Sequence, residues 1–219
     1  MSRIVSLVNT KGGVGRSTIA LGLAATFAGS LRTLLVDTDP QKSASEIAQW
    51  PTDVQFDHVR LRSAETMDVL LPKLSYDLVI VDTPQGYGFP QRDSAIRNSD
   101  LVLVPTQPSP LDLRGTLRTV SDLLAPAEVP HRVLLNKTSG RQTPDSSAIE
   151  RFLPQAQLPF MRTIVRKHKA LMNSEGWEAV LSVTPSRMST PAILNFGALA
   201  VEVLALLGTE MRRLSPSSV

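Results

Sequence analysis

The residues best suited to chemistry in this chain of 219 residues form the stretch TKGGVGRST at positions 10–18. Its three glycines, Gly12, Gly13 and Gly15, let successive backbone N–H groups turn inward and approach a polyphosphate without an intervening Cβ. An apolar run precedes the stretch at 4–8, and an Ala/Leu-rich segment follows it at 19–28. This order predicts a strand, a phosphate-binding loop and a helix whose N-terminal dipole favours the same anion.

The cation of this loop departs from the usual pattern. A loop of the form GxxxxGKS/T carries a lysine just before the hydroxyl residue, whereas Arg16 stands before Ser17 here and Lys11 lies near the start of the loop. Arginine keeps the positive charge but replaces a compact ammonium with a planar fork, which can still hold a phosphate oxygen. Because a displacement of about 1 Å can cost on the order of 100-fold in rate, we predict retained or weakened nucleotide binding and slow hydrolysis.

Carboxylates follow two further apolar runs. Asp37 and Asp39 come after the run 34–36 in LLVDTDPQ, and Asp82 comes after 78–81 in LVIVDTP. A single carboxylate at a strand end can be a helix cap or a turn residue. Three of them, in a chain with a glycine loop, predict a carboxylate-lined cleft that faces the phosphates and suits Mg²⁺ and its waters.

Apolar runs alternate with helical patterns along the chain. The predicted strands cover 4–8, 33–36, 78–81, 101–104 and 133–135, with weaker candidates at 54–61 and 160–164. The predicted helices cover 17–30, 64–74, 111–124, 146–153 and 191–207. Continuously apolar strands are typical of a sheet buried on both faces. We therefore expect an α/β fold with a doubly wound, mainly parallel sheet flanked by helices, and ligands at the carboxyl ends of its strands.

Composition limits the classes of protein that fit. The 42% of hydrophobic and 20% of charged residues are ordinary for a globular domain, and we expect one domain over 1–214 with a disordered tail at 215–219. The lack of cysteine excludes disulfides and cysteine-held clusters and fits a reducing cytoplasm. A net charge of +3 permits nucleic-acid binding without arguing strongly for it. We find no apolar run approaching the roughly 20 residues of a membrane span, so we expect no membrane attachment.

Taken in order, the motifs TKGGVGRST, LLVDTDPQ, LVIVDTP, VPTQPSPLDL and LLNK resemble the ParA/MinD family of deviant Walker ATPases. The chain is most similar to the short DNA-partition members, and the resemblance covers nearly its whole length. It implies a P-loop NTPase fold, ATP/ADP and Mg²⁺ as cofactors, and a homodimer in the ATP-bound form.

The resemblance also implies roles for individual residues. Lys11 matches the lysine that reaches the partner subunit's phosphates, and Asp39 the residue that orients the attacking water; with Arg16 they form the expected catalytic set. The nucleotide-binding set comprises Gly12, Gly13, Val14, Gly15, Arg16, Ser17, Thr18, Pro105 and Asn136. The expected metal set comprises Ser17, Asp37 and Asp82, the last of these through water. For Asn136, a contact with the adenine edge and an ordinary local turn bond remain equally open.

The C-terminal third contains the densest basic run, RTIVRKHK at 162–169. It is either a solvated face or a surface for non-specific binding to double-stranded DNA through phosphates. The DNA-binding candidates are Arg162, Arg166, Lys167, Lys169 and Arg187. We expect the helix at 191–207 to pack on the sheet, and the segment 85–99 to be a mobile loop that senses the γ-phosphate.

Our main prediction of function is a cytoplasmic, nucleoid-associated partition ATPase that segregates plasmids or chromosomes with a centromere-binding ParB-type protein. Two alternatives stay open. One is a related ATPase that positions a protein cargo on the nucleoid, and the other is a nucleotide-binding scaffold in which Arg16 has impaired hydrolysis. An iron-protein-type reductase is excluded because the chain has no cysteine.

Overall fold

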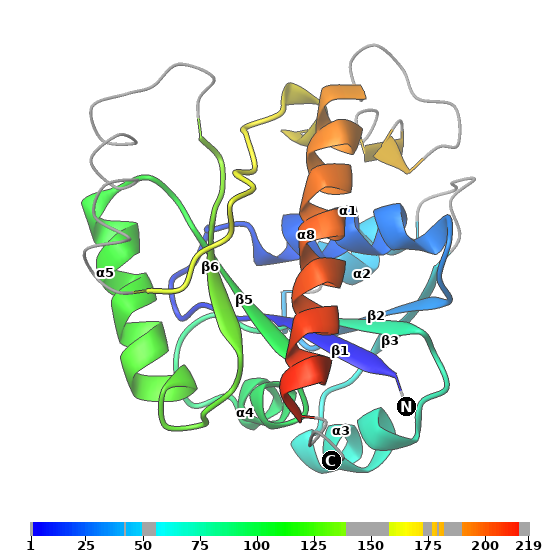
Figure 1. Cartoon of the computed structure of the whole chain (residues 1–219), viewed down its shortest axis with the longest axis vertical. Helices are drawn as coiled ribbons and strands as arrows, with labels where there is room; N and C mark the ends of the chain where they lie inside the picture. Colours follow the sequence, from blue (N-terminus) through cyan, green and yellow to red (C-terminus); the bar gives the residue numbers. More distant parts are fainter. Residues whose placement is uncertain are drawn as a thin grey trace.

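The computed structural model describes residues 2–41, 43–49, 56–138, 158–172, 177–178, 180–181 and 190–214 (Figure 1). Its centre is a six-stranded sheet with the strand order β3-β2-β4-β1-β5-β6, and the neighbouring strands pair in parallel. The strands are β1 (Arg3–Leu7), β2 (Thr33–Asp37), β3 (Asp57–Arg60), β4 (Leu78–Asp82), β5 (Leu101–Thr106) and β6 (His131–Leu135). The predicted parallel sheet is confirmed.

Helices cover both faces of this sheet. They are α1 (Arg16–Ala28), α2 (Ser43–Ala48), α3 (Ala64–Leu70), α4 (Pro90–Arg97), α5 (Pro110–Thr119) and α8 (Thr190–Leu214). Short helical turns follow α3 at Leu71–Lys73 and α5 at Val120–Leu124, and another spans Lys169–Met172. Each predicted helix within the described residues is therefore present, and the predictions at 64–74 and 111–124 each merged a helix with its succeeding turn.

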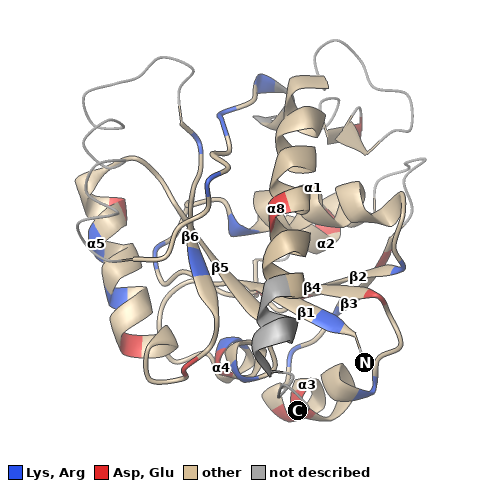
Figure 2. Ribbon diagram, in the orientation of Figure 1, with Lys and Arg blue, Asp and Glu red and all other residues tan. Residues whose placement is uncertain are grey.

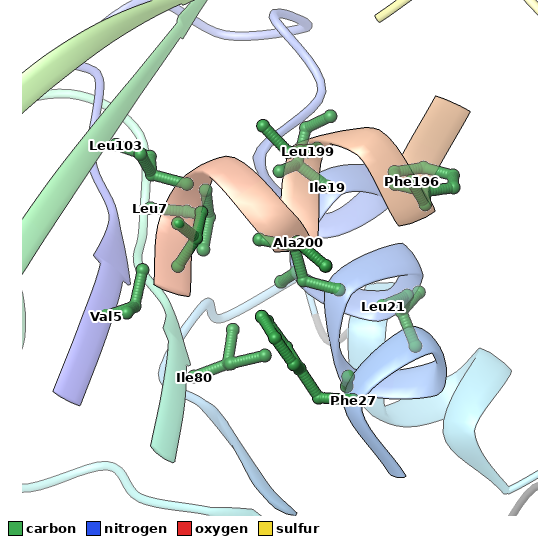
Figure 3. Close-up of a cluster of buried hydrophobic side chains, with 14 of the residues drawn as sticks. Val5, Leu7, Ile19, Leu21, Phe27, Ile80, Leu103, Phe196, Leu199 and Ala200 are labelled. Carbon is green, nitrogen blue, oxygen red and sulfur yellow. The ribbon is translucent and has the colours of Figure 1, made fainter. Parts of the chain in front are cut away.

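Side chains alternate between the two faces of each strand, and this alternation divides the core into layers. Val5 and Leu7 of β1 point into a cluster with α1 and α8, while Ile4, the residue before Val5, points to the opposite face and joins a cluster with α3 and α4. Figure 3 shows Phe196, Leu199 and other side chains of α8 packed against α1 and the sheet. Since period-2 alternation sends neighbouring side chains to opposite faces, apolar strands bury both faces, which confirms the doubly wound fold.

Close approach of α8 to α1 depends on Gly22. A Cβ at this position would stand 2.3 Å from ring atoms of Phe196, which is fully buried. The stretch Thr190–Gly208 is also long and apolar enough to cross a membrane, with a mean hydropathy of 1.8. Our expectation that no apolar run approaches the length of a membrane span was therefore wrong, because this helix has both the length and the hydropathy of one. In the fold, Phe196, Leu199 and Val203 of this helix are buried in the core, as expected for a helix that packs on the sheet.

Five further expectations differ from the structure or lie wholly or partly outside the described residues. The segment 85–99 contains α4, which begins at Pro90 and buries Arg92, so it is not simply a loop. Pro at the first helical position is pre-organised for a helix. Among the described residues, the candidate strand at 160–164 forms no ladder and makes one isolated bridge, between Phe160 and Val133 of β6. The expected helix at 146–153 and the tail at 215–219 lie outside the described residues, as do positions 54 and 55 of the candidate strand at 54–61.

Candidate phosphate-binding site

The sheet register brings the glycine loop and the carboxylates to one edge. Strand β4 lies between β1 and β2, and Asp82 pairs with Leu7 on one side and Asp37 on the other. The glycine loop leaves β1 just after Leu7, and Asp39 stands two residues beyond Asp37. The clustering predicted from strand ends is therefore present.

The loop has the backbone that its glycines permit. Gly13 and Gly15 have φ angles of 76° and 96°, in the left-handed region that favours glycine. α1 begins directly after Gly15, whose carbonyl accepts the first helical bond from the Ile19 N–H at 3.0 Å. A cavity of about 270 Å³ opens beside the loop and is lined by Gly13, Gly15, Arg16, Ser17, Thr18, Asp39, Gln41, Ser43, Gln85 and Lys137. Backbone amides at a helix N-terminus make this cavity suitable for an anion.

Arg16 takes a different role from the phosphate contact that we expected. Its guanidinium donates from Nε to the Thr83 carbonyl at 2.9 Å, and from one terminal nitrogen to the carbonyls of Asn9 and Lys11 at 2.7 and 2.8 Å. The other terminal nitrogen lies 3.8 Å from Asp39 Oδ2. Burial lowers the pKa of Arg16, and the nearby Asp82 and Asp39 oppose that shift. Arg16 thus braces the loop against the end of β4 through backbone carbonyls.

Asp82 is the least satisfied polar group of this site. It is fully buried, and neither carboxylate oxygen makes a well-formed hydrogen bond, although the Ser17 hydroxyl lies close enough to influence it. Burial raises the pKa of Asp82 to about 7, against the opposing influence of the Ser17 hydroxyl and the Arg16 guanidinium. A buried carboxylate without partners is costly unless a proton or a cation satisfies it, so Asp82 together with Ser17 fits a hard cation such as Mg²⁺.

The other two carboxylates are engaged within the protein. Asp37 accepts bonds from the Asp39 N–H at 3.0 Å and from both the N–H and the hydroxyl of Ser45, at 2.9 and 2.6 Å. These bonds tie α2 to the end of β2, which favours a structural role for Asp37 over the expected place beside the metal. Asp39 Oδ1 accepts the Gln41 N–H at 2.8 Å. Among the described residues, no group of three or more His, Cys, Asp or Glu side chains is placed to hold a metal.

Asn136 packs against the loop rather than standing free. Its Nδ2 donates to the Val14 carbonyl at 2.7 Å, and its Oδ1 accepts the Lys137 N–H at 2.8 Å. The side chain is 1% exposed. Of the two roles that the sequence left open for Asn136, these bonds favour the local one. Pro105 lies inside β5, where its carbonyl accepts a bond from Asn9.

Lys137 is a site residue that sequence reasoning missed, although LLNK places it directly after Asn136. Its ammonium donates to the Gly13 carbonyl at 2.7 Å, and its backbone has a φ of 56°. Burial and the neighbouring Lys167 lower the pKa of Lys137. A second cavity, of about 440 Å³, lies on this side of the loop and is lined by Thr18, Gln107, Asn136, Lys137, Arg166, Lys167, His168 and Leu171.

The predicted DNA-binding residues divide between two environments. Arg166 and Lys167 are exposed but line the second cavity, next to the loop. The backbone N–H of Arg162 is bound instead by Glu202 of α8. Figure 2 shows lysine and arginine residues along the segment that contains this run. Lys169 is exposed, and Arg187 lies outside the described residues.

The burial of Asp82 predicts a pH dependence of stability in the absence of metal and nucleotide. Its folded-state pKa of about 7 lies above the unfolded value of 3.8, so between these values the folded protein holds a proton that the unfolded chain has lost. Stability therefore falls as the pH rises through this window. Relative to Asp82→Asn, the wild type should lose up to roughly 4 kcal/mol of unfolding free energy between pH 4 and 7. Urea denaturation in EDTA measures it, and a difference independent of pH would contradict the assignment.

Comparison with known proteins gives sequence matches that cover most of the chain. Residues 5–176 match the CobQ/CobB/MinD/ParA nucleotide binding domain. The chain is 36% identical over 169 residues to the maintenance of carboxysome distribution protein A of Gloeobacter kilaueensis, and the match covers 77% of this chain and 78% of that protein.

Solved structures share the fold. The septum site-determining protein MinD of Pyrococcus horikoshii, complexed with Mg-ADP, has a TM-score of 0.73 at 20% identity, covering 96% of this chain and 99% of that one. An ATP complex of a McdA variant from Cyanothece has a TM-score of 0.71 at 16% identity, covering 94% and 96%. With its glycine loop, strand-end carboxylates and sequence match in agreement, the chain belongs to the CobQ/CobB/MinD/ParA family of nucleotide-binding proteins, within the ParA/MinD group of deviant Walker ATPases.

Proposed function

We propose that this protein is an Mg²⁺-dependent ATPase that positions a protein cargo in the cell. The observation that carries the nucleotide part is the unpartnered, buried carboxylate of Asp82 beside Ser17, at the head of a left-handed glycine loop. The cargo part is supported by the 36% identity to a protein named for carboxysome distribution. That relative favours the cargo-positioning alternative over the plasmid or chromosome partition that was our main reading of the sequence.

The proposed site uses residues on four segments. The loop amides and the N-terminus of α1 would bind the phosphates of ATP or ADP, and the Ser17 hydroxyl and Asp82, through water, would hold Mg²⁺. The bound metal would neutralise charge on the phosphates. Asp39 lines the same cavity as the loop, which supports a role for its carboxylate in orienting the water that would attack the γ-phosphate. Exposed Lys11 would complete the site of a second subunit in an ATP-bound homodimer.

Arg16 is the reason to propose slow turnover. Three of its five N–H donors are engaged with backbone carbonyls, and the remaining terminal nitrogen faces Asp39. Phosphoryl transfer depends on positioned positive charge at the γ-phosphate. A guanidinium held by carbonyls, and close to the water-orienting carboxylate, contributes less of that charge than a lysine that points into the loop.

Arg16→Lys should therefore raise the rate of ATP hydrolysis, by between about 10- and 100-fold if the cation moves by about 1 Å relative to the phosphate. Lysine cannot make all three carbonyl bonds, so its ammonium is freer to reach a phosphate. Phosphate release at saturating Mg-ATP measures the effect. Arg97→Lys is the matched control, because Arg97 is exposed and pairs with Asp68 on α3. Turnover that does not increase in Arg16→Lys would contradict the proposal.

The basic run provides the proposed contact with nucleoid DNA. Replacing Arg166 and Lys167 together by alanine should weaken retention on duplex DNA and reduce the slope of log K against log salt by about 2, as expected when two phosphate contacts are lost. Filter binding at several salt concentrations measures both. The control removes the same charge from the other side of the sheet, at Lys73 and Arg97. Unchanged retention would show that these two residues do not contact DNA. A loss of nucleotide affinity would show that they act at the nucleotide through the second cavity.

A cellular experiment separates cargo positioning from DNA partition. Cells that lack the protein should show clustered or unevenly distributed protein assemblies while plasmids and chromosomes are inherited normally. Asp39→Ala should give the same distribution defect, since it removes the residue that we place at the attacking water. Fluorescence microscopy of candidate assemblies, with a plasmid-loss assay in parallel, measures the two outcomes. Plasmid or chromosome loss with normally spaced assemblies would overturn cargo positioning and restore partition.

A further inference from the structure

α5 is bonded to the first residues of the phosphate loop. The Thr119 hydroxyl accepts the backbone N–H of Thr10 at 3.0 Å and lies 3.2 Å from Asn9 Oδ1. Asn9 is fully buried, donates to the Thr116 hydroxyl at 3.1 Å and accepts the backbone N–H of Lys11 at 2.9 Å. The backbone of Lys11 is therefore held to α5 through Asn9.

The side chain of Lys11 also rests on α5. A Cβ built on Gly115 would lie 3.0, 3.6 and 3.8 Å from Lys11 Cβ, Cγ and Cδ, and these three atoms are its nearest neighbours. The aliphatic stem of Lys11 thus runs across the helix at the one residue without a side chain. Glycine is unfavourable inside a helix, and Gly115 has no left-handed φ angle that would require it. Replacing Gly115 by alanine would put a methyl group into the space that the Lys11 side chain now crosses.

We propose that Gly115 is a positioning residue for Lys11: it forms, with Thr116 and Thr119, a seat on α5 that sets the direction in which the Lys11 ammonium leaves the loop. A lysine side chain has many rotamers, and packing its methylenes restricts them while the ammonium stays in water. The seat holds this cation at the surface of its own subunit, where a second copy of the chain can meet it. This inference rests on the proposed ATP-dependent homodimer.

A purely structural role for Gly115 predicts something different. If the glycine only let α5 approach the sheet, a Cβ would meet the backbone or core side chains of β5 or β1. Its nearest atoms belong instead to one exposed side chain. The added methyl would stand 3.0 Å from Lys11 Cβ, which is attached directly to the loop backbone, so Lys11 or α5 must shift by a few tenths of an ångström while the rest of the fold need not change.

The test uses Gly115→Ala, with Gly197→Ala as the matched control, because Gly197 lies in α8 and a Cβ there would have nothing within 4 Å. Gly115→Ala should fold with a thermal stability close to that of the wild type, because the helix preference of alanine offsets the displacement of Lys11. It should bind ATP as a monomer within about twofold of the wild type, but its ATP-dependent dimer should weaken by at least about 10-fold, since misplaced charge at a desolvated contact is costly. Gly197→Ala should dimerise normally.

Two further measurements distinguish a failure of the seat on α5 from a failure of the proposed homodimer. In protein labelled at lysine, the Lys11 methylene signals, assigned by their loss in Lys11→Arg, should shift in nucleotide-free Gly115→Ala and not in Gly197→Ala. In a double-mutant cycle, Gly115→Ala should add no further loss of dimerisation to Lys11→Ala. Unshifted Lys11 signals, a normal dimer in Gly115→Ala, or full additivity with Lys11→Ala would each overturn the inference. A wild type that does not dimerise with ATP would overturn the proposed function instead, and the lysine signals would still decide whether the seat exists.

Discussion

Parallel pairing of β4 with both β1 and β2 is the constraint on which the site depends. It aligns the ends of three central strands, so that Asp82 lies level with Leu7 and Asp37. The loop after β1 and the carboxylates at the ends of β2 and β4 then meet at one edge of the sheet. Apolar side chains on both faces hold this alignment, because a register slip of one residue would exchange the contents of the two core layers.

The aligned strand ends enclose charges that water does not reach. Arg16 and Asp82 are both buried, and the charge of each favours the charged form of the other. Against the larger effect of burial, Asp82 raises the pKa of Arg16, and Arg16 lowers the pKa of Asp82. Arg16 is satisfied by carbonyls of Asn9, Lys11 and Thr83, whereas the Asp82 oxygens have no hydrogen-bond partner. The protein thus satisfies its buried cation internally and leaves its buried anion to be satisfied by a proton or a metal ion. This asymmetry fits a site that binds Mg-nucleotide and turns it over slowly.

Helix α5 connects this site to the surface. Its Thr116 and Thr119 bond to the residues that open the loop, and Gly115 accommodates the stem of Lys11. A cation that serves a second subunit has to be directed away from its own phosphates, and a helix is a more rigid support for that purpose than a loop. The proposed dimer, and the proposed positioning of cargo that requires it, depend on where Lys11 points.

The sequence alone determined the parts of this protein that depend on local chemistry. Glycines at 13 and 15 specify a left-handed loop because other residues rarely adopt those φ angles, and continuous apolar runs specify strands buried on both faces. The tertiary structure alone decided which partners the polar side chains found. Asp37 was expected beside a metal and binds Ser45, and Arg16 was expected on a phosphate and binds three carbonyls. Lys137 and Gly115 had been given no role in the site. The physical reason is that a long polar side chain takes whichever donor or acceptor lies within about 3 Å, and residues distant in sequence supply that neighbour only when the sheet has formed.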